Sequence, residues 1–232
     1  MDWNSDIIKN LTWPGAISNL ESKQKAAEKI ASKVSNGDII GVGSGSTSYL
    51  AVLAIAQRIK NEKLHIKAIP TSIEIALTCS KVGIPVTSLY ENGPDWYFDG
   101  ADEVDPNHHM IKGRGGAMFK EKLIMSASRY NYILVDDSKL VDSLGSKFAV
   151  PVEVFPNALM NVEVKLKMLG ANEILLRPAQ GKDGPVISES GNLILDVRFD
   201  TIDKEMEFKI KCITGVIESG LFQNHQAEII VA

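Results

Sequence analysis

The chain has 232 residues, of which 44% are hydrophobic and 23% charged, a composition typical of a globular protein with one large or two modest domains. Its 29 acidic residues outnumber the 25 basic ones, and the net charge of −4 disfavours a nucleic-acid-binding protein, which usually carries a basic footprint. An anionic ligand would therefore have to be bound by local basic groups.

The cysteines and the apolar runs predict a cytoplasmic protein. Cys79 and Cys212 lie far apart without metal-ligand spacing, which favours free thiols in a reducing compartment. Residues 1–6 include two aspartates and no basic segment, so we expect no signal peptide. No apolar run is long enough to span a bilayer, and we expect no membrane contact.

The first two thirds of the chain alternate between expected strands and helices. Residues 1–20 contain the turn signal Trp13-Pro14-Gly15 and predict a short N-terminal arm, loosely structured or docked. Apolar spacing then predicts helices over 20–34, 44–59, 72–82 and 117–130, and strands over 38–43, 64–70, 85–89, 96–98 and 132–135. This alternation predicts a parallel sheet covered by helices.

The rhythm changes after about Ser146. The pattern predicts strands over 150–155, 173–177, 193–199 and 216–219, and helices over 158–169 and 204–213, with a hairpin turn at 190–192. The order β-α-β-β-α-β is that of a split βαβ, or ferredoxin-like, arrangement. The last apolar segment, 228–231, is expected to return to the first sheet.

Gly43-Ser44-Gly45-Ser46-Thr47 joins a predicted strand to a helix. Backbone N–H groups and the helix dipole favour an anion there, and a small phosphorylated ligand fits best. The dinucleotide fingerprint and the Walker A pattern both fail at this position. A tight turn with an N-cap and no ligand is the alternative.

Asp99-Gly100-Ala101-Asp102-Glu103 follows the aromatic strand 96–98, where ligands bind in open α/β sheets. Two carboxylates three residues apart can bind sugar hydroxyls. The alternative is an acidic turn that only faces solvent. The spacing misses the EF-hand calcium pattern. The adjacent His108 and His109 are more typical of a polar surface, and we expect no metal.

A basic glycine-rich segment and a helical carboxylate follow. In Lys112-Gly113-Arg114-Gly115-Gly116 the backbone can approach a ligand closely, and Lys112 offers a cation for an oxyanion. Glu121 has apolar helical neighbours, which indicates either a buried salt bridge or a general base. Lys139, after the strand 132–135, either reaches the same pocket or is a surface charge.

Taken together, the runs GVGSGST, DGADE and KGxGGA, with a glutamate nine residues after the lysine, resemble the ribose-5-phosphate isomerase family of the A type, in order and spacing, from about Lys23 to the C-terminus. The resemblance implies a Rossmann-like catalytic domain (1–146 and 220–232, with 1–20 as an arm) and a ferredoxin-like domain (147–219). It also implies a homo-oligomer, a dimer or a tetramer, that acts in the non-oxidative pentose phosphate pathway.

The resemblance also assigns roles to residues. It implies that Glu121 is the catalytic base, assisted by Asp99, Asp102 and Lys112, without cofactor or metal. It implies a sugar-phosphate site formed by Lys23, Ser44, Gly45, Ser46, Thr47, Asp99, Gly100, Ala101, Asp102, Lys112, Gly113, Arg114, Gly115 and Lys139. Arg114 stands where many members have glycine, and residues 1–20 have no counterpart that we can place.

The expected reaction moves a proton between neighbouring carbons of ribose 5-phosphate through an enediolate and gives ribulose 5-phosphate. Two other hypotheses are weaker. An amino-sugar-phosphate deaminase would need a histidine-centred ring-opening site, for which no match is seen. A sugar-phosphate-sensing regulatory domain usually follows a helix-turn-helix, and residues 1–20 are too few for one.

Overall fold

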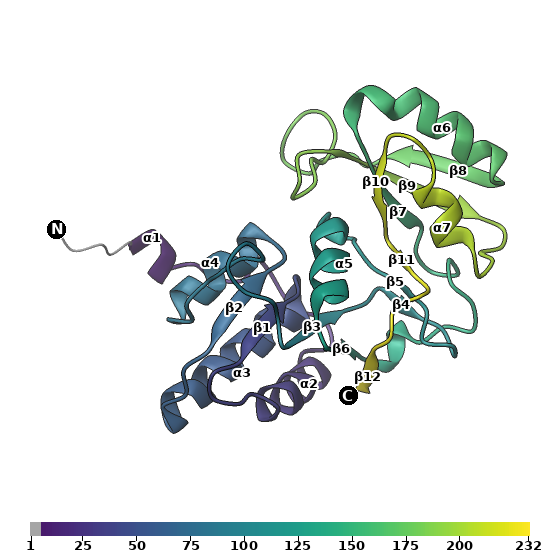
Figure 1. Ribbon diagram of the computed structural model, residues 1–232. Helices are drawn as coiled ribbons and strands as arrows, with labels where there is room; N and C mark the ends of the chain where they lie inside the picture. Colours follow the sequence, from purple (N-terminus) through teal and green to yellow (C-terminus); the bar gives the residue numbers. More distant parts are fainter. Residues whose placement is uncertain (1–5) are drawn as a thin grey trace. The chain divides into compact units, whose positions relative to one another are not determined.

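The computed structural model describes residues 6–232, which form two compact units. The first unit contains the described residues up to Gly100, together with 124–137 and 227–232. The second unit contains 101–123 and 138–226. Figure 1 shows the elements of both units, coloured along the chain.

The first unit contains a five-stranded parallel sheet in the order β12-β6-β3-β1-β2. Its strands are β1 (Ile39–Val42), β2 (Lys67–Pro70), β3 (Trp96–Gly100), β6 (Tyr130–Val135) and β12 (Glu228–Val231). Numbered along the chain, this is the doubly wound order 2-1-3-4-5, and the strand order reverses between β1 and β3. Ligands bind at such a point, outside the carboxyl ends of the strands. The predicted return of 228–231 to the first sheet is confirmed.

Helices cover both faces of this sheet. The first unit contains α2 (Leu20–Ser32), α3 (Ser46–Glu62), α4 (Ile73–Lys81) and the last residues of α5 (Met118–Ala127). On one face Ile40 and Phe98 belong to an apolar core with Ile30 of α2 and Val52 of α3. On the other face Gly41 lies so close to α5 that an added Cβ would be 2.5 Å from Ile124. The predicted helix-covered parallel sheet is confirmed.

The described part of the N-terminal arm contacts the first unit. It contains α1 (Asp6–Lys9), and the Trp13 ring centroid lies 5.3 Å from that of Tyr49 in α3. Lys81 of α4 donates a hydrogen bond to the Leu11 carbonyl. Residues 6–13 therefore dock on α3 and α4, whereas residues 1–5 of the predicted arm lie outside the described chain.

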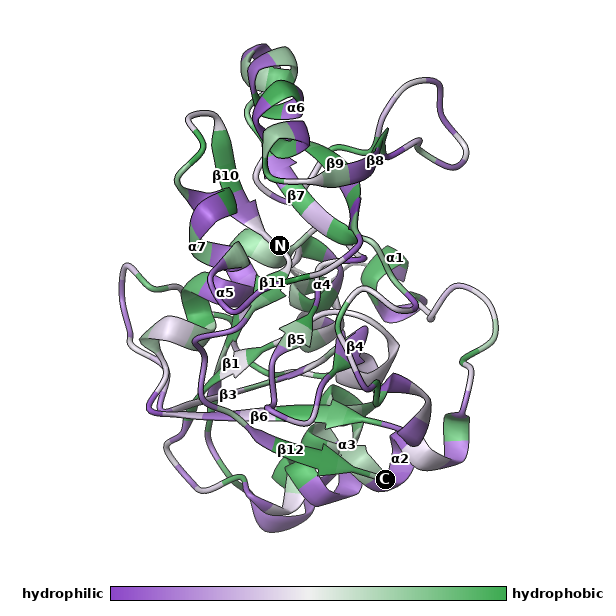
Figure 2. Ribbon diagram, turned by 90° about the vertical axis from the view of Figure 1, so that its right-hand side faces the viewer, coloured by the Kyte–Doolittle hydropathy of each residue, from purple (hydrophilic) through white to green (hydrophobic). Residues whose placement is uncertain are grey.

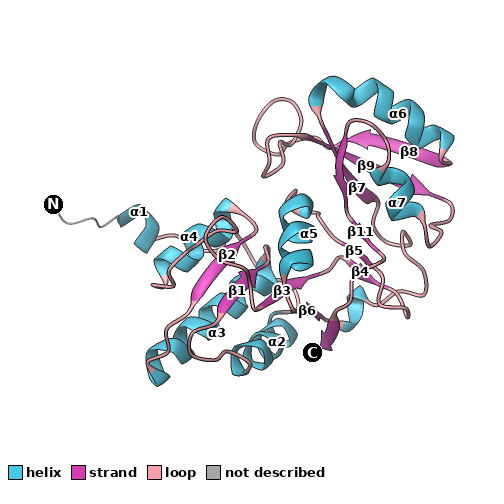
Figure 3. Cartoon of the chain, in the orientation of Figure 1, coloured by secondary structure: helices cyan, strands magenta, loops and turns pink. Residues whose placement is uncertain are grey.

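The second unit contains a four-stranded antiparallel sheet in the order β10-β7-β9-β8. Its elements are β7 (Val150–Val154), α6 (Leu159–Met168), β8 (Ala171–Leu176), β9 (Leu193–Phe199), α7 (Met206–Lys211) and β10 (Val216–Ser219). Figure 3 labels its strands β7, β8 and β9, drawn in magenta, and its helices α6 and α7, drawn in cyan. Along the chain the order is 4-1-3-2, with β-α-β-β-α-β connectivity, and the predicted ferredoxin-like arrangement is confirmed. Both helices pack on one sheet face, since Leu166 and Ile210 share a core with Val152 and Val197.

A small three-stranded sheet in this unit was not predicted. It joins β4 (Glu103–Val104), β5 (Met110–Ile111) and β11 (Leu221–Phe222), and short 3₁₀ turns occupy Asp137–Lys139 and Pro156–Ala158. Residues 101–123 belong to the second unit, together with the antiparallel sheet. The predicted division had assigned them to the catalytic domain. The proposed division at 146/147 and 219/220 stays a prediction.

The predicted strand at 85–89 does not form. Only an isolated bridge joins Val86 to Ala68, where Ala68 donates to the Pro85 carbonyl and accepts from Thr87. Pro85 has no N–H to extend the ladder, and the chain turns at Ser88, whose carbonyl accepts from Glu91 and Asn92. β2 therefore remains the edge strand of the described sheet.

Candidate active site

The predicted phosphate loop lies between β1 and α3, at the point where the strand order of the first unit reverses. Gly45 precedes α3 with φ +89° and has no side chain to cap the helix. The Lys23 ammonium donates to Ser46 Oγ at 3.0 Å, which brings a cation to the first turn. A helix N-terminus with hydroxyls and a nearby ammonium is suited to a phosphate.

Ser44 is held by two hydroxyl residues that the sequence analysis did not name. Its Oγ lies 2.7 Å from Thr71 Oγ1 and 2.7 Å from Ser72 Oγ. Thr71 and Ser72 directly follow β2, and Ser72 also caps α4 by accepting from the Ile75 N–H. Because β2 is parallel to β1, the carboxyl ends of both strands lie at the same sheet edge. Thr71 and Ser72 could therefore have been predicted as site residues from their place directly after β2.

Asp99, at the end of β3, is 1% exposed and hydrogen-bonded at both carboxylate oxygens. The Tyr97 hydroxyl donates to Oδ2, while the Gly100 N–H and the Ser48 hydroxyl lie 2.7 and 3.3 Å from Oδ1. Tyr97 was missed, although alternation along a strand puts residues 97 and 99 on one face. Three donors fix the orientation of this buried carboxylate.

Lys112 and Glu121 form a buried ion pair in the second unit. The Lys112 Nζ lies 3.2 Å from Glu121 Oε2, and the two residues are 2% and 4% exposed. Glu121 lies in the first turn of α5, and the Lys112 amide donates to the Gly220 carbonyl. Burying two charges is costly even when they are paired, so this arrangement indicates a functional site.

The glycine-rich segment between them is fixed by its contacts. Gly113 has φ +93°, and an added Cβ would lie 2.7 Å from the Met118 side chain, so only glycine fits. The Arg114 amide donates to Asp102 Oδ2 at 3.3 Å. Arg177, a residue distant in sequence that was not predicted, donates to the Gly113 and Arg114 carbonyls at 3.3 and 2.8 Å.

Asp102 lies among three of the predicted site cations. Burial raises the pKa of its carboxyl above the usual value, while the charges of Lys112, Lys139 and Arg114 act in the opposite direction. Asp102 therefore retains its proton more readily than an exposed aspartate does. A carboxyl with a raised pKa is suited to exchanging protons near neutral pH.

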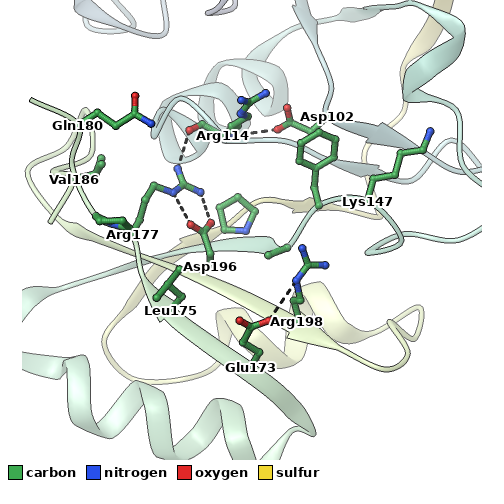
Figure 4. A pocket seen from close by; sticks show the side chains of 14 residues that line it. Asp102, Arg114, Lys147, Glu173, Leu175, Arg177, Gln180, Val186, Asp196 and Arg198 are labelled. Carbon is green, nitrogen blue, oxygen red and sulfur yellow. Dashed lines mark hydrogen bonds and ion pairs between the residues drawn. The ribbon is translucent and has the colours of Figure 1, made fainter.

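A cavity of about 620 Å³ opens beside Asp102 within the second unit (Figure 4). Arg114 and Asp102 lie at one end of it, and the Arg177 guanidinium pairs with Asp196. Arg198 pairs with Glu173 at 3.5 Å. The cavity is lined by Asp102, Arg114, Lys147, Phe148, Ala149, Pro151, Glu173, Leu175, Arg177, Pro178, Gln180, Val186, Asp196 and Arg198.

The predicted site residues are therefore distributed over both units. The first unit holds Lys23, Ser44, Gly45, Ser46, Thr47, Asp99 and Gly100, and the second holds Ala101, Asp102, Lys112, Gly113, Arg114, Gly115, Glu121 and Lys139. Within residues 6–232, no group of three or more His, Cys, Asp or Glu side chains has the geometry of a metal site. None of the described helices is long and apolar enough to cross a bilayer.

One unit contains a doubly wound sheet with a phosphate-type loop, and the other, ferredoxin-like unit contains a buried carboxylate–ammonium pair. These features are suited to a sugar-phosphate enzyme of the aldose–ketose isomerase class. Residues 67–232 match the family model described as ribose 5-phosphate isomerase A (phosphoriboisomerase A). The chain belongs to this family, and the predicted family, fold class and enzyme class are confirmed. Residues 23 and 44–47 precede the matched segment.

Individual relatives match most of this chain in sequence and in structure. A ribose-5-phosphate isomerase A from Methanothermobacter thermautotrophicus is 41% identical over 202 residues, or 86% of this chain and 88% of the relative. The solved ribose 5-phosphate isomerase A of Methanocaldococcus jannaschii matches 92% of this chain and 95% of its own with a TM-score of 0.89 and 39% identity. A D-ribose-5-phosphate isomerase solved in complex with phospho-erythronic acid covers 93% and 95%, with a TM-score of 0.88 and 38% identity.

Proposed function

We propose that the chain interconverts D-ribose 5-phosphate and D-ribulose 5-phosphate through an enediolate, with Glu121 as the general base. The observation that carries this assignment is the buried Glu121 carboxylate, whose Oε2 lies 3.2 Å from the Lys112 ammonium. A buried carboxylate beside an ammonium can serve as the base that accepts a carbon-bound proton.

The chemistry needs one proton to move between two adjacent carbons. Starting from the aldose, Glu121 removes the C2 proton, and the electron pair of that bond forms the C1–C2 double bond of the enediolate. The carbonyl oxygen becomes an oxyanion, which the Lys112 ammonium stabilises. Glu121 then returns the proton to C1, while the C2 hydroxyl gives up its proton and the C1 oxygen takes one. The C2 oxygen becomes the ketose carbonyl and the C1 oxygen a hydroxyl, so that no redox cofactor or metal is required.

Asp99 and Asp102 have the complementary task of orienting the sugar hydroxyls and moving protons between oxygens, including during ring opening. The Asp102 carboxyl, whose pKa is raised by burial, is suited to giving and taking a proton. The phosphate binds at residues 44–47 with Lys23, and Lys139 supplies a further contact. Binding energy from a phosphate remote from the reacting carbons can be used to orient them for the base.

The ligand of one solved relative supports this chemistry. Phospho-erythronic acid, bound in that relative, carries a carboxylate next to its phosphorylated carbon chain. A planar, charged carboxylate resembles the planar, charged end of an enediolate. A site that stabilises such an intermediate is expected to bind its analogue more tightly than the sugar substrate.

The test compares Glu121→Gln with wild type in an assay of ketose formation from ribose 5-phosphate. We expect kcat to fall by about 10²- to 10⁴-fold, because the amide cannot accept the carbon-bound proton. Binding of ribose 5-phosphate, measured by calorimetry, should persist within about tenfold, since the phosphate contacts remain. Exchange of the C2 proton with solvent, followed by NMR, should be lost in parallel.

Glu189→Gln is a matched control in the same unit. Glu189 lies 3.8 Å from Lys120 and contributes no proposed catalytic atom, so this variant should keep near-normal turnover. Turnover of Glu121→Gln close to that of Glu189→Gln would remove Glu121 from the role of base.

The thiols support a cytoplasmic location, which we also propose. Cys79 and Cys212 are both free, the first buried and the second exposed. Burial raises the pKa of the Cys79 thiol to about 12, so it remains an uncharged, unreactive part of the core. An exposed free thiol such as Cys212 is typical of a reducing compartment.

An exposed apolar surface on the ferredoxin-like unit supports a homo-oligomer, a dimer or a tetramer. Met160, Val164 and Met168 recur every four residues along α6 and are 71%, 48% and 71% exposed. Figure 2 shows green, hydrophobic segments recurring along this helix. Exposed apolar side chains in a row on one helix face are typical of a surface that another copy covers.

A further inference from the structure

Phe148 lies beneath two cations of the candidate site. The Arg114 guanidinium carbon lies 5.8 Å from the centroid of the Phe148 ring, and the Lys139 Nζ lies 5.2 Å from it. Both distances are within the range of a cation–π interaction. Among residues 6–232, neither cation forms an ion pair with a carboxylate, so the ring is the shared contact of both charges.

The backbone fixes where this ring lies. Glu103 is fully buried and accepts hydrogen bonds from the amides of Gly145, Lys147 and Phe148, each at 2.6 Å. Glu103 directly follows Asp102 in the chain. Three charge-assisted hydrogen bonds to one carboxylate therefore tie the segment that carries Phe148 to the segment that carries Asp102.

Asp102 and Arg114, both labelled in Figure 4, line a cavity to which Phe148 also contributes. We propose that Phe148 is a positioning residue for the isomerisation, whose ring holds the Arg114 guanidinium and the Lys139 ammonium beside Asp102. This inference rests on the proposed function, in which Asp102 acts on the sugar hydroxyls. It gives a role to Arg114, an exposed cation of the predicted site.

The electrostatic consequence follows from the charges around Asp102. Burial raises the pKa of the Asp102 carboxyl, and Lys112, Lys139 and Arg114 each act to lower it. The other charged side chains of the cavity are engaged elsewhere: Arg177 with Asp196, Arg198 with Glu173, and Lys147 with the carbonyls of Ser138 and Leu140. If the ring is lost, Arg114 and Lys139 are free to turn towards solvent, and the pKa of Asp102 rises further.

The experiment is a ¹³C NMR titration of the Asp102 carboxyl in the full-length chain labelled with [4-¹³C]aspartate. The signal is assigned by its absence in Asp102→Asn. In Phe148→Leu, and in Phe148→Met as a second variant of similar volume, we expect the Asp102 pKa to rise by about 0.5 unit or more. Phe148→Tyr keeps the ring face and should titrate as wild type.

Arg114→Gln removes one of the two cations without changing the core, since Arg114 is exposed, and should raise the Asp102 pKa in the same direction. Arg198→Gln is the matched control, because this cation lines the same cavity and pairs with Glu173. It should leave the Asp102 signal unchanged. In kinetics, the acid limb of kcat/KM for ribose 5-phosphate should move to higher pH in Phe148→Leu by the same amount as the signal.

An Asp102 signal that titrates at the wild-type pH in both Phe148→Leu and Phe148→Met overturns the inference. A uniform loss of activity at all pH values, without a shift of the signal, would indicate a purely structural role. If circular dichroism shows that neither Phe148 variant folds, the titration of Arg114→Gln tests the inference instead. An Asp102 signal that is not shifted in Arg114→Gln overturns it. The titration needs no substrate. A wild type without isomerase activity on ribose 5-phosphate would therefore contradict the proposed function, while the Asp102 titration would still test the role of Phe148.

Discussion

At the scale of single residues, Gly43 directly follows β1 and lies against Asp99 at the end of β3. A Cβ added at this position would lie well under 3.0 Å from the Asp99 side chain, far inside van der Waals contact. The site therefore combines a buried carboxylate with a strand end that has no side chain. Glycine is required here by the space that Asp99 occupies and not by backbone conformation.

We expect Gly43→Ala to destabilise the fold by about 1–3 kcal/mol, because the new methyl group must push the Asp99 side chain or β1 aside. Displacing Asp99 should also lower kcat/KM for ribose 5-phosphate by about tenfold or more, since small misplacements of site groups are costly. Urea unfolding and steady-state kinetics measure both effects.

Gly93→Ala is the control, because an added Cβ at Gly93 meets no atom within 4 Å. This variant should remain within about 0.5 kcal/mol of wild type and keep full activity. If Gly43→Ala behaves like Gly93→Ala, the close approach between Gly43 and Asp99 does not exist in solution.

The site residues that could be predicted are those with a local signal. Asp99 and Lys112 stand in short motifs at strand ends, and Glu121 is a carboxylate among apolar helix neighbours. Arg177 and Phe148 carry no such signal, because their contacts join segments about 63 and 34 residues apart in the chain, a separation set by the tertiary fold. Lys112 and Glu121 were named separately, and only the structure shows that they form one ion pair.

At the scale of elements, α5 is anchored in the second unit through Lys122, the residue after Glu121. Its Nζ lies 2.7 Å from Glu207 of α7 and 2.9 Å from Glu218 of β10, and it donates to the Leu221 carbonyl of β11. The ammonium also lies 4.6 Å from the Phe222 ring. One buried cation thus connects α5 to three other elements of the second unit.

We expect Lys122→Met to destabilise the protein by about 3–5 kcal/mol, because it removes the buried cation that Glu207 and Glu218 share. The measurement is urea unfolding at pH 7. Lys120→Met is the matched control on the same helix, since its pair with Glu189, at 3.8 Å, is more exposed and should contribute less than about 1 kcal/mol. Equal losses in the two variants would contradict the anchoring role.

The pH dependence of the stability difference between wild type and Lys122→Met tests the ion pairs of Lys122 further. Burial alone would raise the pKa of Glu207, but the hydrogen bond from His225 and the charge of Lys122 lower it from 4.5 to about 2. A lowered pKa stabilises the folded state above pH 4.5, and this stability is lost as the pH falls through about 2. The wild-type and Lys122→Met unfolding free energies should therefore converge between these values.

The elements that were predicted correctly have clear periodicity or turn signals. β9 and β10 have the expected bounds, 193–199 and 216–219, and α2 begins at the expected Leu20. The three-stranded sheet was missed because β4, β5 and β11 have two residues each, too few to show an alternating pattern. The segment 85–89 has strand-forming residues, but Pro85 limits it to one bridge.

At the scale of the whole molecule, the chain distributes one set of predicted site residues over two units. The chain passes from the first unit to the second between Gly100 and Ala101, inside the acidic segment. It passes back to the first unit within α5, three residues after Glu121. The ferredoxin-like order places α6 and α7 on one sheet face and leaves β8 as an edge strand of the antiparallel sheet. The apolar face of α6, and Leu175 on β8, are then exposed in a single copy of the described chain.

We expect wild type to form a homodimer or homotetramer at micromolar concentration, and Val164→Glu to shift it towards monomer by at least about tenfold in dissociation constant, because a charge in a buried apolar contact is costly. Val164 lies between Met160 and Met168 in the exposed row on α6, whereas Lys165 is exposed one position outside it. Lys165→Glu introduces the same side chain and should leave the assembly intact. Sedimentation velocity over a concentration series measures both variants, and circular dichroism checks that they remain folded. A monomeric wild type, or an assembly that Val164→Glu leaves unchanged, would exclude this helix face as the interface.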